Sequence, residues 1–127
     1  MTTTQNQASR STAKQALGAY GEEVAARHLM QQGMVVLDRN WRGPAGELDL
    51  VLWDGAVVVF CEVKTRSSGA CGSPLEGVTA QKAARLRRLA GQWLHAHAVH
   101  AREVRIDLVG VDCSGGAERV DHVAGVC

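Results

Sequence analysis

The chain has 127 residues, of which 46% are hydrophobic and 21% are charged, and this composition excludes a wholly disordered protein. Its length suits one domain with one hydrophobic core and leaves no room for a second domain. The 14 basic and 13 acidic residues give a formal net charge of +1, so any binding of nucleic acid must depend on local patches of charge.

The N-terminal segment MTTTQNQASRST is polar and has no periodicity. We therefore expect residues 1–14 to form a disordered tail ahead of a single domain over residues 15–127. No apolar run reaches the roughly 18 to 20 residues that span a bilayer, and the N-terminus lacks the apolar centre of a secretory signal. These features predict a cytoplasmic protein. The four cysteines are scattered, with no metal-binding spacing, and are expected to be reduced thiols.

A first helix is predicted from Leu17 to Gln31, because apolar residues recur there at helical spacing and Gly33 follows. The run MVVLDRNWR, residues 34–42, predicts a strand, which the GPAG segment at residues 43–46 ends. Two more strands are predicted on either side of Asp54-Gly55, a dipeptide that suits a two-residue type I′ hairpin turn.

The Gly- and Ser-rich segment SSGACGSP, residues 67–74, predicts a mobile loop. Thr79 can cap a second helix that runs to about His97, with a set of apolar residues on one face: Ala83, Leu86, Ala90, Trp93 and Leu94. The run EVRIDLVGV, residues 103–111, predicts a strand, and ERVDHV, residues 118–123, a short last strand. The order of helix, three strands, helix and strands predicts an α/β domain with a mixed sheet flanked by helices.

The predicted hairpin brings charged residues together. With Asp54 and Gly55 in the turn, Asp49 faces Phe60 and Glu47 faces Glu62. Alternation places one wholly apolar set on a single face, which we take as the core face: Leu48, Leu50, Leu52, Val57, Val59, Cys61 and Val63. The opposite face carries Asp49, Glu62 and Lys64, with Asp49 and Glu62 as diagonal neighbours about 7 Å apart, within joint reach of one ion.

These charges allow two interpretations. Opposed glutamates cost up to about 1 kcal/mol unless a cation compensates them, and oxygen ligands suit Mg²⁺ or Mn²⁺. A neighbouring Lys64 could then stabilise developing negative charge or orient the attacking water. Alternatively, the charges form a solvated strand end at which Lys64 neutralises two glutamates. A bulge between Asp49 and Glu62 would also change the register on which the metal site depends.

Asp49, followed by Glu62-Val63-Lys64 on the next strand, resembles the PD-(D/E)xK signature of restriction-endonuclease-like nucleases. Further segments resemble, in the same order, the YraN family of small bacterial proteins, related to Holliday junction resolvases; they are GAYGEEVAARHL, NWRGPAGELDLV, VVFCEVKTR, TAQKAARL and VRIDLVGV. The resemblance covers roughly residues 17–112. It implies a restriction-endonuclease-like core and Mg²⁺- or Mn²⁺-dependent hydrolysis of phosphodiester bonds in DNA, with branched or otherwise structured DNA among the candidate substrates.

The resemblance also implies roles for individual residues. Asp49, Glu62 and the backbone carbonyl of Val63 would be metal ligands, and Lys64 the catalytic lysine. Glu22 matches a helical glutamate that joins such sites in resolvase-like members, although it also fits an ordinary surface glutamate. The chain departs from the strict signature at Leu48, where a proline would precede the aspartate.

A basic set on the second predicted helix could contact phosphates, because Lys82, Arg85 and Arg88 follow one another at three-residue spacing. Arg42 and Arg66 flank the proposed site and would extend its positive rim. A solvated helix face is the commoner explanation of such a run. The resemblance implies a DNA nuclease that is a candidate homodimer. Two alternatives remain: a non-catalytic nucleic-acid-binding or scaffold domain, and a purely structural interaction protein.

Overall fold

The computed structural model describes residues 2–67 and 77–126. Its elements follow in the order α1 (Thr2–Gln31), β1 (Val35–Gly43), β2 (Gly46–Asp54), β3 (Val57–Arg66), α2 (Ala80–Ala96), β4 (Glu103–Gly115) and β5 (Ala117–Val123). This order confirms the predicted α/β fold. The loop predicted over residues 67–74 lies, after its first residue, outside the described residues.

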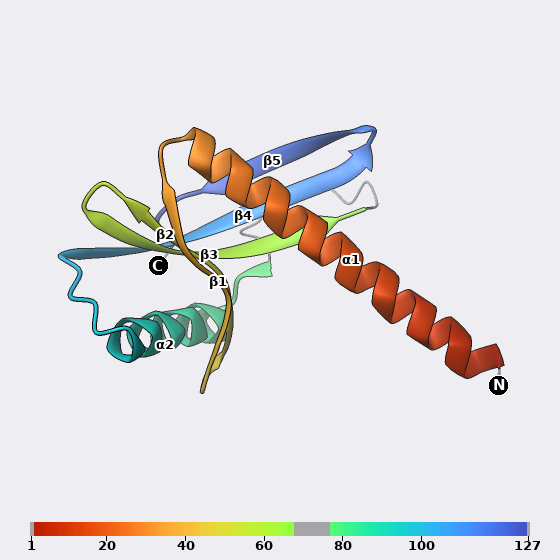
Figure 1. The fold of residues 1–127 in the computed structure, drawn as a ribbon, viewed down its shortest axis with the longest axis horizontal. Helices are drawn as coiled ribbons and strands as arrows, with labels where there is room; N and C mark the ends of the chain where they lie inside the picture. Colours follow the sequence, from red (N-terminus) through yellow and green to blue (C-terminus); the bar gives the residue numbers. More distant parts are fainter. Residues whose placement is uncertain (1, 68–76, 127) are drawn as a thin grey trace.

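The five strands form one mixed sheet in the order β1-β2-β3-β4-β5. β3 and β4 are parallel, and the other neighbouring pairs are antiparallel. Parallel neighbours need a crossover connection, and α2 lies in the connection between β3 and β4. The two helices lie on opposite sides of the sheet (Figure 1).

Each helix covers its own hydrophobic cluster. Beneath α1 the buried residues are Ala25, Ala26, Leu29, Met34, Leu50, Leu52, Val59, Cys61, Val109 and Val111. Beneath α2 they are Leu48, Val51, Val58, Phe60, Leu86, Leu89, Ala90, Trp93, Ile106 and Leu108. The prediction of a single core face is therefore wrong, because the crossover helix buries the second face of the central strands as well.

Helix α1 begins much earlier than predicted. It runs from Thr2, so the segment expected as a disordered tail over residues 1–14 is helical from that residue on. The chain has neither Gly nor Pro before Gly18, and its Ala, Gln and Lys residues have good helix propensity. The N-terminal half of α1 extends away from the sheet (Figure 1), which agrees with the exclusion of this segment from the core.

The helix α2 is confirmed in its start and its end. The Thr79 side chain accepts a hydrogen bond from the Lys82 backbone N–H at 3.1 Å and so caps the first turn. Leu89 is buried together with the predicted Leu86 and Trp93, so the apolar face is wider than the sequence pattern indicated.

The β2–β3 turn differs from the predicted one by a shift of one position. Asp54 pairs with Val57, so the two turn residues are Gly55 and Ala56. Gly55 has a φ of 70°, and glycine at the first central position is the preference of a type II′ turn. The predicted turn would instead have required a positive φ at Asp54. Two predicted oppositions are therefore wrong: Asp49 with Phe60, and Glu47 with Glu62.

Within the described part of the chain, no helix is long and apolar enough to cross a membrane. Cys61 and Cys113 are free thiols, as expected. The other two cysteines, Cys71 and Cys127, lie outside the described residues.

Candidate functional site

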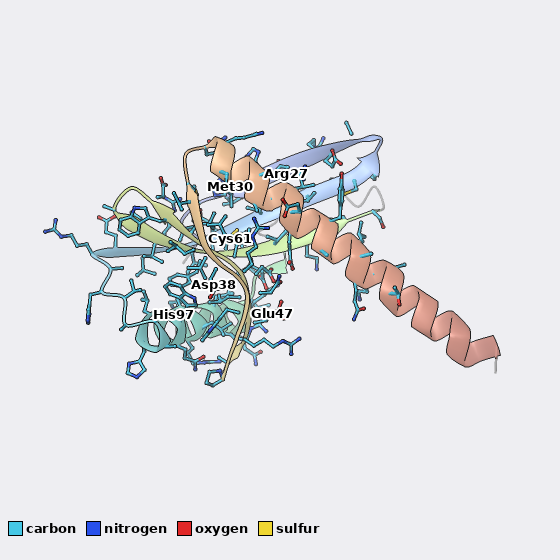
Figure 2. All side chains as sticks on the ribbon, in the orientation of Figure 1. Arg27, Met30, Asp38, Glu47, Cys61 and His97 are labelled. Atoms are coloured by element: carbon cyan, nitrogen blue, oxygen red, sulfur yellow. The ribbon has the colours of Figure 1, made fainter. Side chains whose placement is uncertain are left out.

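Three carboxylates meet where α1 passes the beginning of β2. Glu22, Glu47 and Asp49 each offer an oxygen atom, and these atoms all lie within 4.8 Å of one another. We call these three residues the acidic cluster. In the view of Figure 2, Glu47 lies between the two helices. Glu22 and Asp49 are predicted site residues, whereas Glu47 was not predicted as a ligand; its spacing of two residues from Asp49 is the signal that could have indicated it.

A close contact between α1 and β3 positions Glu22. Gly21 is buried, and a Cβ atom at this position would overlap the side chain of Thr65. Only glycine therefore allows the helix backbone to come this close to the strand. Asn40, which has a φ of 51°, donates a side-chain hydrogen bond that favours the charged form of Glu22. The sequence analysis missed the role of Gly21, although the GAYGEE segment contains it.

The strand β2 interrupts its alternation at Asp49. Leu48 packs beneath α2, whereas Leu50, two residues later, packs beneath α1. The regular β2–β3 pairing ends at Leu50 and Cys61, and the Val63 backbone N–H donates instead to Asp49 Oδ2 at 2.8 Å. The carboxylate of Asp49 therefore replaces a backbone acceptor at the point where the two strands separate.

The negative charge of the acidic cluster is compensated only in part, by the exposed Arg42 at Glu47 and by the hydrogen bond from Asn40 to Glu22. Burial raises the pKa of Asp49 from 3.8 to about 7; the Val63 N–H acts in the opposite direction, and the charges of Glu22, Glu62 and Glu47 add to the increase. The pKa of Glu22 is also raised, first by burial and then by Glu47, against the hydrogen bond from Asn40. A divalent cation would relieve this repulsion, and an all-oxygen donor set suits Mg²⁺ or Mn²⁺.

Glu62 is directed to the other helix. Its Oε2 lies 3.2 Å from Lys82 Nζ, and its Oε1 lies 3.6 Å from Arg85 Nη2, both on α2. Glu62 is therefore not among the three carboxylates that converge within 4.8 Å, although its charge still acts on Asp49. Along β3, Phe60 packs beneath α2 and Cys61 beneath α1, so regular alternation directs Glu62 to the α2 side.

The predicted basic residues mostly gather at two hollows that share Lys82. One is a pocket lined by Glu62, Lys64, Arg66, Gly77, Lys82, Leu108 and Val109. The other is an open groove lined by Thr79, Gln81, Lys82, Arg85 and Arg88, which we call the basic groove. Arg42 lies elsewhere, since its exposed side chain reaches Glu47 of the acidic cluster at 3.4 Å.

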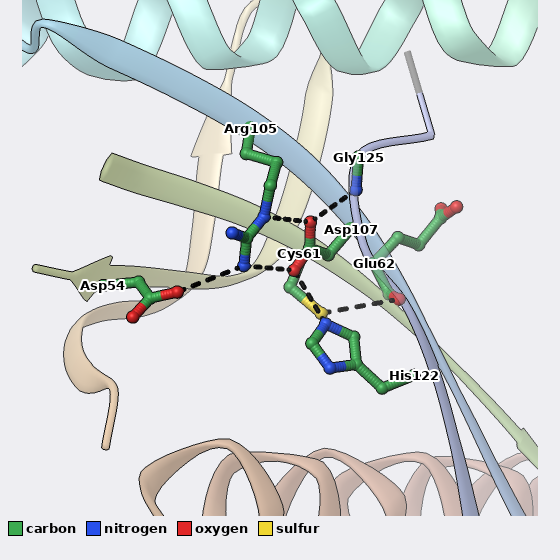
Figure 3. A network of polar contacts seen from close by, with 7 residues as sticks. All are labelled: Asp54, Cys61, Glu62, Arg105, Asp107, His122 and Gly125. Carbon is green, nitrogen blue, oxygen red and sulfur yellow. Dashed lines mark hydrogen bonds and ion pairs between the residues drawn. The ribbon is translucent and has the colours of Figure 1, made fainter. Parts of the chain in front are cut away.

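A second carboxylate cluster was not anticipated. Asp107 is fully buried and accepts hydrogen bonds from Arg105 Nε at 2.8 Å, Arg105 Nη2 at 3.0 Å and Gly125 N at 3.0 Å (Figure 3). His122 Nε2 lies 2.7 Å from the same carboxylate, and Arg105 also reaches Asp54 at 3.4 Å. Burial acts to raise the pKa of Asp107, but the bonds from Arg105, His122 and Gly125 outweigh it and hold the pKa below 3.8.

The chain is similar to proteins that share one family description. The model of "Uncharacterised protein family UPF0102" matches residues 21–111. A UPF0102 protein of Nocardioides sp. is 62% identical over 114 residues, which are 89% of this chain and 92% of that protein. A UPF0102 protein of Beutenbergia cavernae is 61% identical over 115 residues, 90% of this chain and 98% of its own. One of Streptomyces coelicolor is 53% identical over 117 residues, 90% of each chain. The matched region contains the acidic cluster and the basic groove.

Proposed function

This chain belongs to the uncharacterised protein family UPF0102, as its resemblance to the YraN family indicated, and we propose that it is a metal-dependent nuclease with a restriction-endonuclease-like core. The observation that carries the proposal is the acidic cluster, in which Glu22, Glu47 and Asp49 bring carboxylate oxygens within 4.8 Å of one another. Acidic residues converge in this way at a cost, and ligand-binding sites are where proteins accept such a cost.

The donor set fits a hard divalent cation. Glu22, Glu47 and Asp49 would hold Mg²⁺ or Mn²⁺, and magnesium commonly takes one or two protein carboxylates and completes its shell with water and phosphate. When bound, the ion would supply charge neutralisation and Lewis-acid polarisation of the phosphodiester. The hydrogen bond from the Val63 N–H fixes the orientation of Asp49. The backbone carbonyl of Val63 remains a proposed ligand.

Lys64 and Glu62 complete the proposed machinery from the α2 side. Lys64 is exposed and lines the same pocket as Glu62. Its ammonium group would stabilise negative charge that develops on the phosphoryl oxygens. For Glu62 to act as a metal ligand, its carboxylate must leave Lys82 and Arg85.

The proposed substrate is DNA held by its phosphates. Lys82, Arg85 and Arg88 line the basic groove, and Arg66 lines the adjoining pocket. Positively charged side chains at such positions bind the backbone without reading sequence, so affinity should fall as salt rises. Branched DNA is a candidate because of the resemblance to Holliday junction resolvases. Symmetric cutting of a junction would require two sites, which a homodimer would supply.

The test is cleavage of labelled junction, flap, single-stranded and duplex DNA in the presence of Mn²⁺ or Mg²⁺. We expect Asp49→Ala and Lys64→Ala to abolish cleavage. Glu23→Ala is the matched control, because Glu23 neighbours Glu22 on α1 but pairs with Arg27 and Arg39 outside the cluster. Activity that survives both site substitutions would show that the nuclease is a contaminant.

A second candidate function is that of a non-catalytic nucleic-acid-binding domain. The observation in its favour is that Glu62 forms ion pairs with Lys82 and Arg85 and is not part of the acidic cluster. Such a domain would bind DNA in a salt-dependent manner that requires the basic groove and is insensitive to Asp49→Ala. Binding without metal-dependent cleavage on every substrate would favour it.

A further inference from the structure

The carboxylate of Glu62 forms ion pairs with two side chains of α2, one to each oxygen. Lys82 Nζ lies 3.2 Å from Oε2, and Arg85 Nη2 lies 3.6 Å from Oε1. The three side chains are 22% (Glu62), 28% (Lys82) and 41% (Arg85) exposed, so water and salt reach the contacts. Ion pairs of this kind contribute little to stability and exchange readily for other partners.

The same two basic side chains line the basic groove. Lys82 and Arg85 contribute to it together with Arg88, and Lys82 also lines the pocket that contains Glu62 and Lys64. A phosphate that enters the groove therefore contacts the groups that Glu62 occupies. It competes for those groups, and its negative charge repels the carboxylate.

Glu62 is also adjacent in sequence to the residue that holds Asp49 in place. The next residue, Val63, donates its N–H to Asp49 Oδ2 at 2.8 Å. Since Glu62 precedes Val63 and its charge already acts on Asp49, a rotation of its side chain would direct the carboxylate from α2 toward Asp49 without a change of backbone pairing. A cation held by Asp49, Glu22 and Glu47 would attract it there.

We propose that Lys82 and Arg85 are positioning residues that latch Glu62 away from the acidic cluster, and that a nucleic-acid phosphate in the basic groove releases it to complete a divalent-cation site. The inference rests on the proposed function and adds its regulation. Cation binding and nucleic-acid binding strengthen each other through Glu62, so metal alone binds an incomplete site.

The coupling has a thermodynamic consequence that can be measured from either side. If nucleic acid increases the affinity for the cation by some factor, the cation increases the affinity for nucleic acid by the same factor. Couplings between two sites are typically about 5- to 150-fold. Substitution of Lys82 and Arg85 should give the protein without nucleic acid the same increase in cation affinity.

The first experiment measures Mn²⁺ affinity from the electron paramagnetic resonance signal of free Mn²⁺, without nucleic acid. We expect Lys82→Ala/Arg85→Ala to bind Mn²⁺ at least about 5-fold more tightly than the unmodified chain. Arg87→Ala/Arg102→Ala is the matched control, because it removes two exposed positive charges that neither line the basic groove nor pair with Glu62. An unchanged affinity in Lys82→Ala/Arg85→Ala would overturn the latch.

Loss of positive charge could by itself strengthen cation binding, and Glu62→Gln separates this effect from the latch. In the Lys82→Ala/Arg85→Ala background, Glu62→Gln should abolish the gain in Mn²⁺ affinity, because the gain requires the released carboxylate. A gain that persists in the triple variant would overturn the latch and assign the effect to general electrostatics.

The reciprocal experiment uses a short labelled single-stranded DNA and Lys64→Ala, so that cleavage does not interfere. Fluorescence anisotropy should show tighter DNA binding with Mn²⁺ than without it, and Glu62→Gln should remove most of that difference. DNA binding that ignores Mn²⁺ would overturn the coupling. Failure of the latch is distinct from failure of the nuclease proposal: Asp49-dependent Mn²⁺ binding without coupling overturns only the latch, whereas no Mn²⁺ binding in any variant overturns both.

Discussion

Two sites in the molecule shift the pKa of a carboxylate in opposite directions: the acidic cluster, and the hydrogen bonds that Arg105, His122 and Gly125 make to Asp107, which we call the Asp107 network. Asp107 has no exposed surface, yet hydrogen bonds from Arg105, His122 and Gly125 hold its pKa below 3.8. Asp49 is more exposed, yet its pKa is raised to about 7, because burial and neighbouring acidic groups outweigh the single bond from Val63. Burial acts to raise the pKa of both carboxylates, and the hydrogen bonds that each accepts decide whether the pKa stays raised.

The difference separates a structural carboxylate from a candidate ligand. The four contacts on Asp107 satisfy both oxygens and connect β4 to β5 and to the segment at Gly125 (Figure 3). No further ligand is needed there. At the acidic cluster, burial and the charges of Glu22 and Glu47 raise the pKa of Asp49, and a bound cation would relieve that repulsion.

The largest expected effect comes from Asp107→Asn. The side-chain amide that replaces the carboxylate points its NH₂ group at groups that donate to Asp107, and Arg105 and His122 lose their negatively charged partner. We expect a loss of about 3 to 5 kcal/mol in the free energy of unfolding at pH 7, measured by urea denaturation. Asp54→Asn, at the more exposed end of the same network, is the control and should cost less than about 1 kcal/mol. A comparable cost for both would contradict a special role for Asp107.

A smaller change is expected from metal. At a free Mn²⁺ concentration 100 times the dissociation constant, the free energy of unfolding should rise by about 2.7 kcal/mol, because the ion binds only the folded chain. Thermal denaturation with and without Mn²⁺ measures the change, and Asp49→Asn should remove it. Glu23→Gln should preserve it, since Glu23 lies outside the acidic cluster. Stabilisation that survives Asp49→Asn would place the ion elsewhere.

Without metal, Asp49→Asn should stabilise the protein at pH 8. The folded pKa of Asp49 is about 7 against an ordinary 3.8, and each unit of difference corresponds to about 1.4 kcal/mol. Since folding favours the protonated acid, its contribution is fully present below pH 3.8 and is lost as pH rises toward 7. We expect the gain from Asp49→Asn to grow across that window, in denaturation midpoints measured at several pH values.

Asp107 should show the opposite dependence on pH. Its folded pKa is lowered, so its contribution is present above the ordinary value of 3.8 and is lost as pH falls through the folded pKa. Asp107→Asn should therefore flatten the acid limb of the stability curve, in denaturation midpoints measured below pH 4. Parallel curves for the two Asn variants would remove the distinction between the sites.

The smallest effect is expected from Glu23→Gln. Hydrogen bonds from Arg39 and Arg27 lower the pKa of Glu23, but the pairs are exposed and screened by water. We expect no measurable change in the urea midpoint, at low or high salt. A clear loss of stability would show that surface pairs on α1 matter as much as the buried network.

Sequence patterns by themselves determined the order of the elements, the Thr79 cap and the presence of acidic residues near the end of β2. These features depend on interactions within a few residues, such as periodicity, capping and turn preference. The Asp107 network was overlooked because its partners come from β5 and the segment that follows it, and no local pattern connects them.

The tertiary structure alone decided how the acidic residues are directed. Asp49 meets Glu22 of α1 because β2 and β3 separate at Val63, where the Asp49 carboxylate accepts a hydrogen bond, and because Gly21 lets the helix approach Thr65. Glu62 turns toward α2 because Lys82 and Arg85 arrive from a helix about twenty residues later in the chain. Strand alternation predicts which face a side chain should occupy, but it predicts neither an interruption such as the one at Asp49 nor the charged partners that a later helix brings to Glu62.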